Sequence, residues 1–358
     1  MITTDYNEII NKIDKINPIK YGKDRNYING SVSRLSPYIS RGVISPKYIY
    51  NFLINKGYTL MKIQKFVQEL VWREYWQFIW MNNKIDKDLK NTQNDVLQYG
   101  IPFSILNHST KIKAIDNAIK ELYREGYIHN HLRMYIASVT TNIAKYHWRI
   151  PAKWMYYHLL DADWGSNALS WQWVCGSNSN KKYYANQDNI NRFTNTFQKD
   201  TILDHSYEEL IKMKQPLSFV ENTLLKLKTN LPLKNNFIKN DDKPMCIYNF
   251  YNLDVKWREK INAHRVLLIE PSIFTKYPIS KKSLEFMIEL SKNISNIKIF
   301  VGEFKELPIG NSKVYFKEHP LNYNYKGTED SREWLCFPST KFKSFFKHWN
   351  YVVRQLLA

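Results

Sequence analysis

The sequence predicts a mainly α-helical domain followed by a small α/β domain with a parallel sheet. Apolar residues recur at helical spacing over much of residues 1–212. After residue 243 the pattern changes to short apolar runs separated by one helical segment, which is typical of a βαβ unit. Residues 213–243 contain Pro216 and Pro232 and are predicted to be a linker.

Capping residues and periodicity place the helices of the first part. Ser45 and Pro46 suit the N-cap and first turn of a helix that ends after about three turns. Apolar residues at helical spacing predict a second helix over residues 60–80. Two further helices are expected over residues 116–125 and 132–144.

The α/β part, residues 244–358, is predicted from β-branched and aromatic runs. Neither a GxGxxG nor a GxxxxGK[ST] loop accompanies them, so no nucleotide-binding motif supports a nucleotide site in this part. Strands are expected at residues 246–251, 265–269, 298–301 and 314–316, with an amphipathic helix at residues 281–292.

The chain of 358 residues carries a formal net charge of +19, which favours a polyanionic partner, with nucleic acid the first to consider. The alternative is compositional drift, because Lys, Asn and Ile are abundant throughout. The three cysteines fit a reducing compartment. The N-terminus lacks a signal-peptide pattern, and no run approaches the roughly 18 apolar residues of a membrane span. We therefore expect a soluble, cytoplasmic protein without a membrane partner.

The helix around residue 70 carries an unusual polar and aromatic face. Glu69, Trp72, Arg73 and Trp76 follow one another at i, i+3, i+4 and i+7 and therefore share that face. Such a face suits a flat aromatic ligand, with the guanidinium opposite an anion and the carboxyl offering a proton. The alternative is an ordinary surface pair of Glu69 and Arg73 beside core tryptophans.

Two loops add compatible chemistry. Ser33 to Ser36 follow Gly30 in a predicted turn, where hydroxyls and backbone N–H groups suit a phosphate. Asp161 and Asp163 resemble metal ligands, but no His or Cys accompanies them at ligand spacing. Hydrogen bonding to a sugar hydroxyl or a flavin N–H is the better use, and no metal site is predicted.

Four motifs together resemble the FAD-binding domain of the photolyase/cryptochrome family. They are SRLS at residues 33–36, ELVWREYW at 69–76, HNHLRM at 129–134 and DADWGSNALSWQW at 161–173. The resemblance covers about residues 21–193 and implies a photolyase-type helical fold with FAD as cofactor. Residues 181–190 are closer to a branch of short, photolyase-related bacterial and viral proteins.

The resemblance implies roles for individual residues. It places Asn167 opposite flavin N5, where similar photolyases carry Asn and many cryptochromes carry Cys or Asp. The residues that it assigns to FAD binding are Tyr21, Val32, Ser33, Arg34, Leu35, Ser36, Arg73, Asn130, Arg133, Asp161, Asp163 and Asn167.

It also implies a pocket for a damaged pyrimidine pair flipped out of DNA. Glu69 matches the glutamate that hydrogen-bonds the lesion, and His131 stands where many relatives have a DNA-contacting Arg. The residues that it assigns to DNA or the lesion are Arg25, Glu69, Trp72, Trp76, Asn130, His131, Met134 and Trp173.

Trp171 and Trp148 match the first two members of the chain of tryptophans that reduces the flavin again. The third, surface tryptophan has no clear counterpart, so the route is expected to leave through Trp154, Trp164 or a tyrosine.

The predicted function is light-dependent repair of cyclobutane pyrimidine dimers by electron transfer from reduced FAD, with Glu69, Asn167, Trp171 and Trp148 as catalytic residues. The alternatives are a cryptochrome-like photoreceptor without repair and a non-catalytic, FAD-containing nucleic-acid-binding protein. UV-damaged DNA, duplex or single-stranded, is the expected partner, and no protein partner is evident. Residues 244–358 are interpreted as a permuted or reduced antenna-type domain, whose short length makes an antenna chromophore doubtful.

Overall fold

A computed structural model of the chain describes residues 2–233, 241–338, 341–342 and 344–358. The chain forms two compact units. Unit 1 comprises residues Met1–Gly22, Ser33–Met81 and Lys228–Ala358, and unit 2 comprises Lys23–Val32 and Asn82–Leu227. Part of the predicted linker, residues 234–240, lies outside the described residues.

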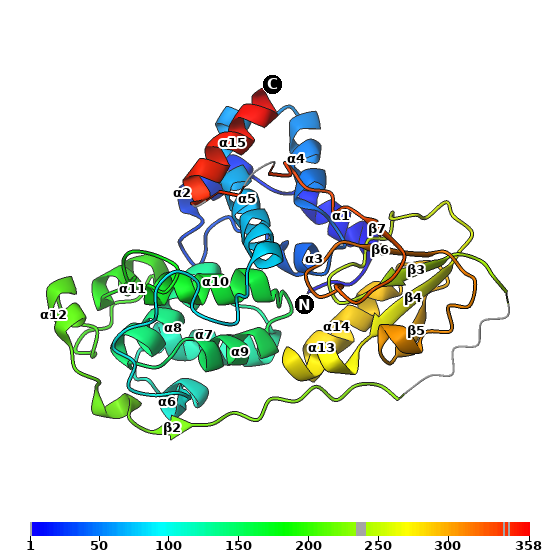
Figure 1. Cartoon of the computed structure of the whole chain (residues 1–358). Coiled ribbons are helices and arrows are strands. Elements are labelled where there is room, and N and C mark those ends of the chain that lie inside the picture. The colour runs from blue at the N-terminus through cyan, green and yellow to red at the C-terminus, as the bar shows by residue number, and fades with distance from the viewer. Residues whose placement is uncertain (1, 234–240, 339–340, 343) are drawn as a thin grey trace. The chain divides into compact units, whose positions relative to one another are not determined.

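The N-terminal helices of unit 1 follow the predicted capping and periodicity. Ser45 is the N-cap of α4, and its side chain accepts a hydrogen bond from the backbone of Tyr48. The long helix α5 confirms the helix expected over residues 60–80. The helices, drawn from blue to cyan in Figure 1, are α1 (Tyr6–Asp14), α2 (Pro18–Asp24), α3 (Ser36–Ser40), α4 (Pro46–Asn55) and α5 (Leu60–Asn82).

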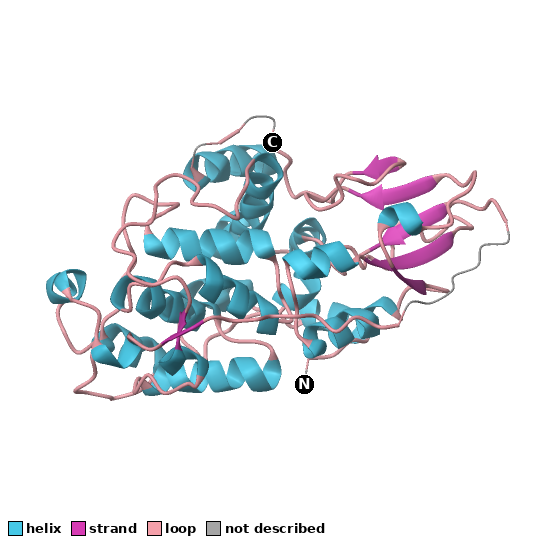
Figure 2. Ribbon diagram, turned by 60° about the horizontal axis from the view of Figure 1, so that its bottom comes forward, coloured by secondary structure: helices cyan, strands magenta, loops and turns pink. Residues whose placement is uncertain are grey.

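The C-terminal part of unit 1 contains the predicted parallel sheet. Its order is β5-β4-β3-β6-β7, and every neighbouring pair is parallel (Figure 2). The strands are β3 (Met245–Tyr248), β4 (His264–Ile269), β5 (Lys298–Val301), β6 (Val314–Lys317) and β7 (Thr328–Asp330). The other elements are α13 (Pro271–Lys276), α14 (Lys281–Ser291), the 3-10 helix η3 (Phe304–Glu306) and α15 (Phe345–Leu357).

One face of this sheet is covered by the segment around η3. Phe304 and Leu307 pack with Tyr325 against alternate residues of β3, β4 and β6. The ring of Phe304 stacks on that of Tyr325 at 4.5 Å between centroids and an interplanar angle of 14°. Strand β7 was not predicted, because its residues Thr-Glu-Asp are exposed or half-buried and give no apolar signal.

Specific contacts join residues 33–81 to the C-terminal sheet region. The guanidinium of Arg41 lies 3.3 Å from the ring centre of Phe250. Gly42 has φ +64°, and a Cβ there would come within 2.5 Å of the Tyr251 carbonyl oxygen, so the close approach requires glycine. The compact units therefore do not follow the predicted boundary near residue 213, because residues before it pack with the C-terminal part.

Unit 2 is a cluster of helices with one short antiparallel pair of strands. The predicted helix over residues 132–144 is α8 followed by a π-helical turn, in which Thr140 and Thr141 donate to carbonyls four residues earlier. The helices are α6 (Phe103–Leu106), α7 (Lys113–Glu125), α8 (Asn130–Ser138), α9 (Arg149–His158), α10 (Trp164–Cys175), α11 (Gln187–Thr194) and α12 (Tyr207–Lys212). The remaining elements are η1 (Val139–Ile143), η2 (Leu217–Phe219), β1 (Ile101–Pro102) and β2 (Asn222–Thr223).

Residues 23–32 join unit 2 through contacts with α11. The backbone N–H of Ile28 donates to the Phe193 carbonyl at 3.0 Å, and Tyr27 packs on the Phe193 ring. Across the described part of the chain, none of the helices is long and apolar enough to cross a bilayer.

Candidate functional site

In unit 1, the four residues predicted to form a ligand face lie on α5. Glu69, Trp72, Arg73 and Trp76 are all half-buried on this helix. Arg73 Nη1 donates to Ser40 Oγ of α3 at 2.8 Å. The hydrogen bond to Ser40 ties the Arg73 guanidinium to α3.

The turn that leads into α3 contains the predicted phosphate-binding residues. Arg34 has φ +52°, a backbone conformation that only a few residue types adopt readily, and its side chain is exposed. The backbone N–H of Leu35 lies 3.4 Å from Ser33 Oγ, and Ser36 begins α3. Val32, just before this turn, is the last residue of the unit 2 segment 23–32.

Tyr21 lies on α2, and its ring packs edge-on against Phe66 of α5 at 5.0 Å between centroids. Together with the Arg73–Ser40 hydrogen bond, this contact connects α2, α3 and α5 in unit 1. Tyr21 on α2 and Ser36 on α3 therefore lie on helices that contact α5, which carries Arg73.

Trp72 has an aromatic partner that the sequence analysis missed. Phe345, the first residue of α15, stacks on Trp72 with 3.4 Å between ring centroids and an interplanar angle of 6°. Trp76 packs against the same indole at 4.9 Å and 37°. Phe345, Trp349 and Val352 are buried at i, i+4 and i+7, and this spacing could have identified α15 as a helix that packs on another element.

The segment before α15 is fastened to α5 by buried polar groups. Glu74 is 5% exposed, and its Oε1 accepts from the backbone N–H of Leu335 at 2.8 Å. Burial raises the pKa of Glu74 to about 8, although the backbone hydrogen bonds to Leu335 and Cys336 act in the opposite direction. Arg332 Nη1 donates to Gln77 Oε1 at 2.8 Å, so α5 holds the C-terminal segment through its other face.

In unit 2, Arg133 of α8 and Asp161, each predicted to bind FAD, form an ion pair. Arg133 Nη2 lies 2.9 Å from Asp161 Oδ2, and Asp161 is only 4% exposed. Arg133 Nε also donates to the Ile128 carbonyl at 3.0 Å, which fixes the guanidinium. Asn130 is exposed at the first position of the same helix, and Met134 is half-buried one turn later.

Asp163 and Asn167 are held at the start of α10. Asp163 is the N-cap, and its carboxylate accepts from the Ser166 backbone N–H at 2.6 Å. Asn167 Nδ2 donates to the Ala152 carbonyl at 2.8 Å. Because that carbonyl can only accept, the orientation of the amide is fixed and Asn167 Oδ1 is left as an acceptor for an N–H group. This chemistry fits a flavin edge.

Arg25 and His131, both predicted to contact DNA, come together in unit 2. His131 Nδ1 lies 2.9 Å from the Asn26 carbonyl oxygen, and its ring packs against Phe193 at 4.7 Å. Burial lowers the pKa of His131, and the charge of Arg25 acts in the same direction against the Asn26 hydrogen bond. Trp173 is exposed beside Tyr183, at 5.8 Å between ring centroids.

The predicted electron-transfer tryptophans Trp171 and Trp148 are both buried. No direct ring contact joins them among the described residues. The ring of Trp148 stacks on that of His147 at 5.8 Å, and His147 stacks on Tyr99 at 5.4 Å. Tyr99 is 67% exposed, so this row of rings runs from a buried indole to the surface.

The two tryptophans considered as the exit lie in the interior. Trp164 and Trp154 are at most 1% exposed. Trp164 Nε1 donates to Asp86, and Trp154 Nε1 donates to the Tyr123 hydroxyl. Both indoles are packed and hydrogen-bonded in the core, and the ring of Trp164 lies 6.3 Å from that of Trp148.

Comparisons with known proteins support the photolyase/cryptochrome family. Residues 66–213 match the family described as the FAD binding domain of DNA photolyase. A deoxyribodipyrimidine photo-lyase of Alkalihalophilus pseudofirmus is 28% identical over 171 residues, covering 45% of this chain and 34% of that protein. Cryptochrome DASH of Danio rerio is 28% identical over 165 residues, covering 40% of this chain and 29% of that protein.

A solved structure of a bacterial class III photolyase from Agrobacterium tumefaciens aligns with a TM-score of 0.45 and 24% identity, covering 52% of this chain and 44% of that one. The matched region spans about a third of the length of the curated relatives.

Proposed function

Because this chain belongs to the photolyase/cryptochrome family through its FAD-binding domain, we propose that it repairs cyclobutane pyrimidine dimers in DNA in a light-dependent reaction. Bound FAD, in its reduced form and excited by light, would supply the electron that splits the dimer. The observation that carries the proposal is the fixed amide of Asn167, which leaves Oδ1 as an acceptor at the position that the resemblance places opposite flavin N5.

The polar residues of unit 2 support FAD binding through fixed geometry. Arg133 and Asp161 hold each other in a nearly buried ion pair, so neither needs to be ordered when a ligand arrives. Asp163 is held as the N-cap of α10. In unit 1, the proposal assigns Tyr21, Arg73 and the turn at residues 32–36 to the same cofactor.

Recognition of the lesion is assigned to the α5 face in unit 1 and to Asn130, Met134 and Trp173 in unit 2. An unstacked lesion costs less to flip out of a duplex, and stacking on an aromatic wall returns about 1 to 3 kcal/mol per base. Phe345 already occupies one face of Trp72, so the indole would meet the dimer through its edge or its other face. Glu69 would donate a hydrogen bond to the dimer from the same helix.

The row Trp148, His147 and Tyr99 supplies an exit for the reduction route that lacks a third tryptophan. Oxidised Trp148 would take an electron from Tyr99 across the stacked imidazole, and the phenol proton would pass to water because Tyr99 is exposed. Trp171 would pass an electron to the flavin and take one from Trp148.

The test uses purified protein loaded with reduced FAD and an oligonucleotide with a single thymine dimer. Dimer loss in blue light and none in the dark is the expected result. No loss in light, with bound FAD fully reduced, would reject repair and favour the photoreceptor alternative. The similarity to cryptochrome DASH is the comparison that fits this alternative. Binding of the oligonucleotide unaffected by light or by the flavin redox state would favour the non-catalytic alternative.

A further inference from the structure

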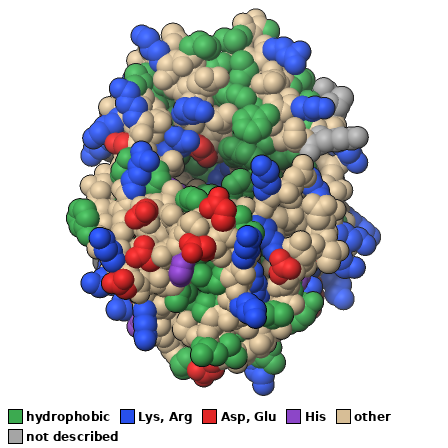
Figure 3. Space-filling view, turned by 90° about the vertical axis from the view of Figure 1, so that its left-hand side faces the viewer, with side chains coloured by type: hydrophobic (Ala, Val, Ile, Leu, Met, Phe, Trp, Pro, Cys, Tyr) green, Lys and Arg blue, Asp and Glu red, His purple; other side chains and the backbone are tan. Residues whose placement is uncertain are grey.

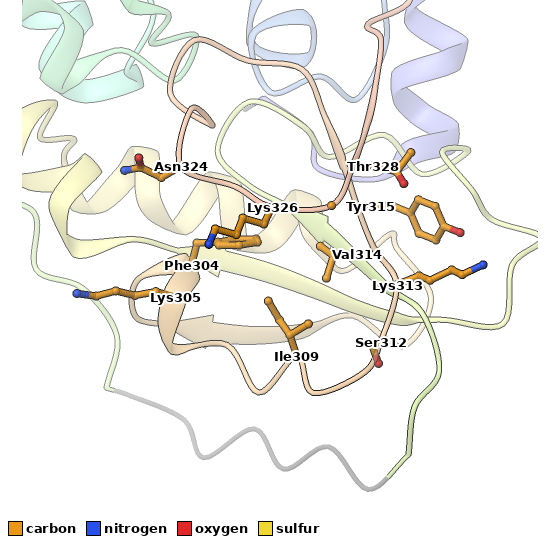
Figure 4. Close-up of a pocket in the computed structure, with 11 residues that line it drawn as sticks. Phe304, Lys305, Ile309, Ser312, Lys313, Val314, Tyr315, Asn324, Lys326 and Thr328 are labelled. Atoms are coloured by element: carbon orange, nitrogen blue, oxygen red, sulfur yellow. The ribbon is translucent and has the colours of Figure 1, made fainter.

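A pocket on the C-terminal sheet of unit 1 is lined by none of the residues assigned to FAD or the lesion. It opens at the start of β6 and β7, beside η3, and has a volume of about 770 Å³ (Figure 4). This is within the range of about 300 to 1,000 Å³ typical of ligand sites. We call it the lysine groove, after Lys305, Lys313 and Lys326, which line it.

The cations of the lysine groove have no carboxylate partner within the part of the chain that the structure describes. Lys305, Lys313 and Lys326 are exposed and form no ion pair with any described residue, and no Asp or Glu lines the groove. Elsewhere in the same α/β region, Lys292 and Lys317 pair with carboxylates at 2.6 and 2.7 Å. The groove therefore presents positive charge that an anion from outside the chain can neutralise.

The floor of the groove is apolar and firmly packed. Phe304 is 5% exposed and stacks on Tyr325, and Val314 is 6% exposed on β6. The Tyr315 ring is backed by the Arg258 guanidinium, 3.7 Å from its centre. A ligand that carries both negative charge and flat apolar surface would match these walls.

The wall formed by residues 324–328 depends on one glycine. Gly327 has φ +143°, and a Cβ there would lie 2.5 Å from the Val314 carbonyl oxygen. Only glycine lets this segment lie so close to β6 in that conformation. The groove is thus a built feature of the fold and does not depend on a chance arrangement of side chains.

The positions of the lysines indicate an extended ligand. In Figure 4, Lys305 lies at one end of the groove and Lys313 at the other, with Lys326 between them. Such spacing suits several phosphates in a row better than one phosphate. Bases reach an apolar floor only when they are not paired inside a duplex, so a single strand fits better than a double helix.

We propose that the lysine groove binds single-stranded nucleic acid, with its phosphates on Lys305, Lys313 and Lys326 and its bases against the apolar floor. This site does not depend on FAD, light or a lesion. Failure of repair therefore leaves it intact, and failure of groove binding leaves the repair proposal intact.

The test measures binding of a fluorescent, undamaged oligothymidylate to the full chain in the dark by anisotropy, over a range of salt concentrations. The Lys305→Gln/Lys313→Gln/Lys326→Gln variant should bind about tenfold more weakly at low salt. The slope of log K against log salt should fall by about 2, because each lost phosphate contact in a single strand removes about 0.7.

The matched control is Lys281→Gln/Lys282→Gln/Lys292→Gln, which removes the same charge from two exposed positions of α14 and from its exposed C-cap, Lys292. The proposal predicts that this control binds like the wild type. Equal weakening in both variants would show a general charge effect and overturn the site. Unfolding curves of both variants, expected to match the wild type, separate binding loss from misfolding.

Competition identifies the ligand class. An unlabelled oligothymidylate should displace the probe far better than thymidine monophosphate or poly-glutamate at equal charge. Equal displacement by the monophosphate would reduce the groove to a single-phosphate site, and equal displacement by poly-glutamate would assign it to acidic protein; either result overturns the proposal. Crosslinks from a 4-thiothymidine oligonucleotide should map to residues 304–328, and their absence there would contradict it.

Discussion

The start of α8 and α10 in unit 2 and the α5 face in unit 1 both carry residues assigned to FAD or the lesion, but different interactions hold them. In unit 2, hydrogen bonds and one ion pair fix Arg133, Asp163 and Asn167 within the helical cluster itself. On α5, Trp72 is held by stacking on Phe345, more than 270 positions later in the sequence. The residues of unit 2 are held by contacts within the helical cluster, whereas the α5 face depends on the C-terminal segment.

The largest effect is expected from breaking the unit 2 ion pair. Arg133→Ala leaves the nearly buried Asp161 without its guanidinium and should destabilise the protein by about 3 to 5 kcal/mol, with loss of FAD. Urea unfolding and flavin content measure both effects. Arg124→Ala, which removes an exposed arginine paired with Glu125, should change neither. Equal behaviour of the two variants would contradict a preformed cofactor site.

Phe345→Ala tests the dependence of α5 on the C-terminal helix. Removing this buried ring should cost about 3 kcal/mol and speed hydrogen exchange over residues 60–82, while leaving α8 and α10 unchanged. Phe346→Ala is the matched control, because Phe346 is the next residue in the chain and its side chain is 64% exposed. Uniform loss of protection in both regions would mean that they are not separately held.

The carboxyl that anchors the C-terminal segment should make stability depend on pH. The pKa of Glu74 is raised to about 8, so its contribution is complete below the unfolded pKa near 4.5 and is lost as pH rises through about 8. Within this window the free energy of unfolding of the wild type should fall by up to about 1.4 kcal/mol per pH unit relative to Glu74→Gln. If urea unfolding gives the same pH dependence of the free energy of unfolding for both proteins, the stabilising role of protonated Glu74 is refuted.

The smallest effect on stability, but a large one on photochemistry, is expected for Tyr99→Phe. The exposed phenol contributes little to folding, yet its loss should slow light-driven reduction of bound FAD and remove a tyrosyl radical signal in electron paramagnetic resonance. Tyr323→Phe, at a residue that is 77% exposed, is the control, and Trp171→Phe should block reduction earlier in the route. Wild-type reduction in Tyr99→Phe would exclude Tyr99 as the exit.

Local sequence patterns were sufficient to predict helices, strands and the residues that share a helix face. The Ser45 cap, helix α5, four of the five strands of the parallel sheet and the arrangement of Glu69, Trp72 and Trp76 on one face follow from periodicity and capping. Four dispersed motifs were enough to identify the family, because their residue types are tied to one cofactor.

Long-range packing could not be predicted from these patterns. Phe345 on Trp72, Glu74 on Leu335 and Arg41 on Phe250 join segments far apart in the chain, and none of the three has a local signature of its partner. This is why the unit boundary was placed near residue 213. The position of Tyr99 could not be predicted for a related reason. Its stacking on His147 depends on the fold and has no signal in the local sequence.

The most direct test of the central claim is the loss of thymine dimers against photon dose, measured at equal FAD loading in the wild type and in Asn167→Asp. Light-dependent repair predicts dose-proportional loss in the wild type, no loss in the dark, and a strongly reduced yield in the variant. A wild-type protein that carries fully reduced FAD and leaves the dimer intact at every dose would contradict it.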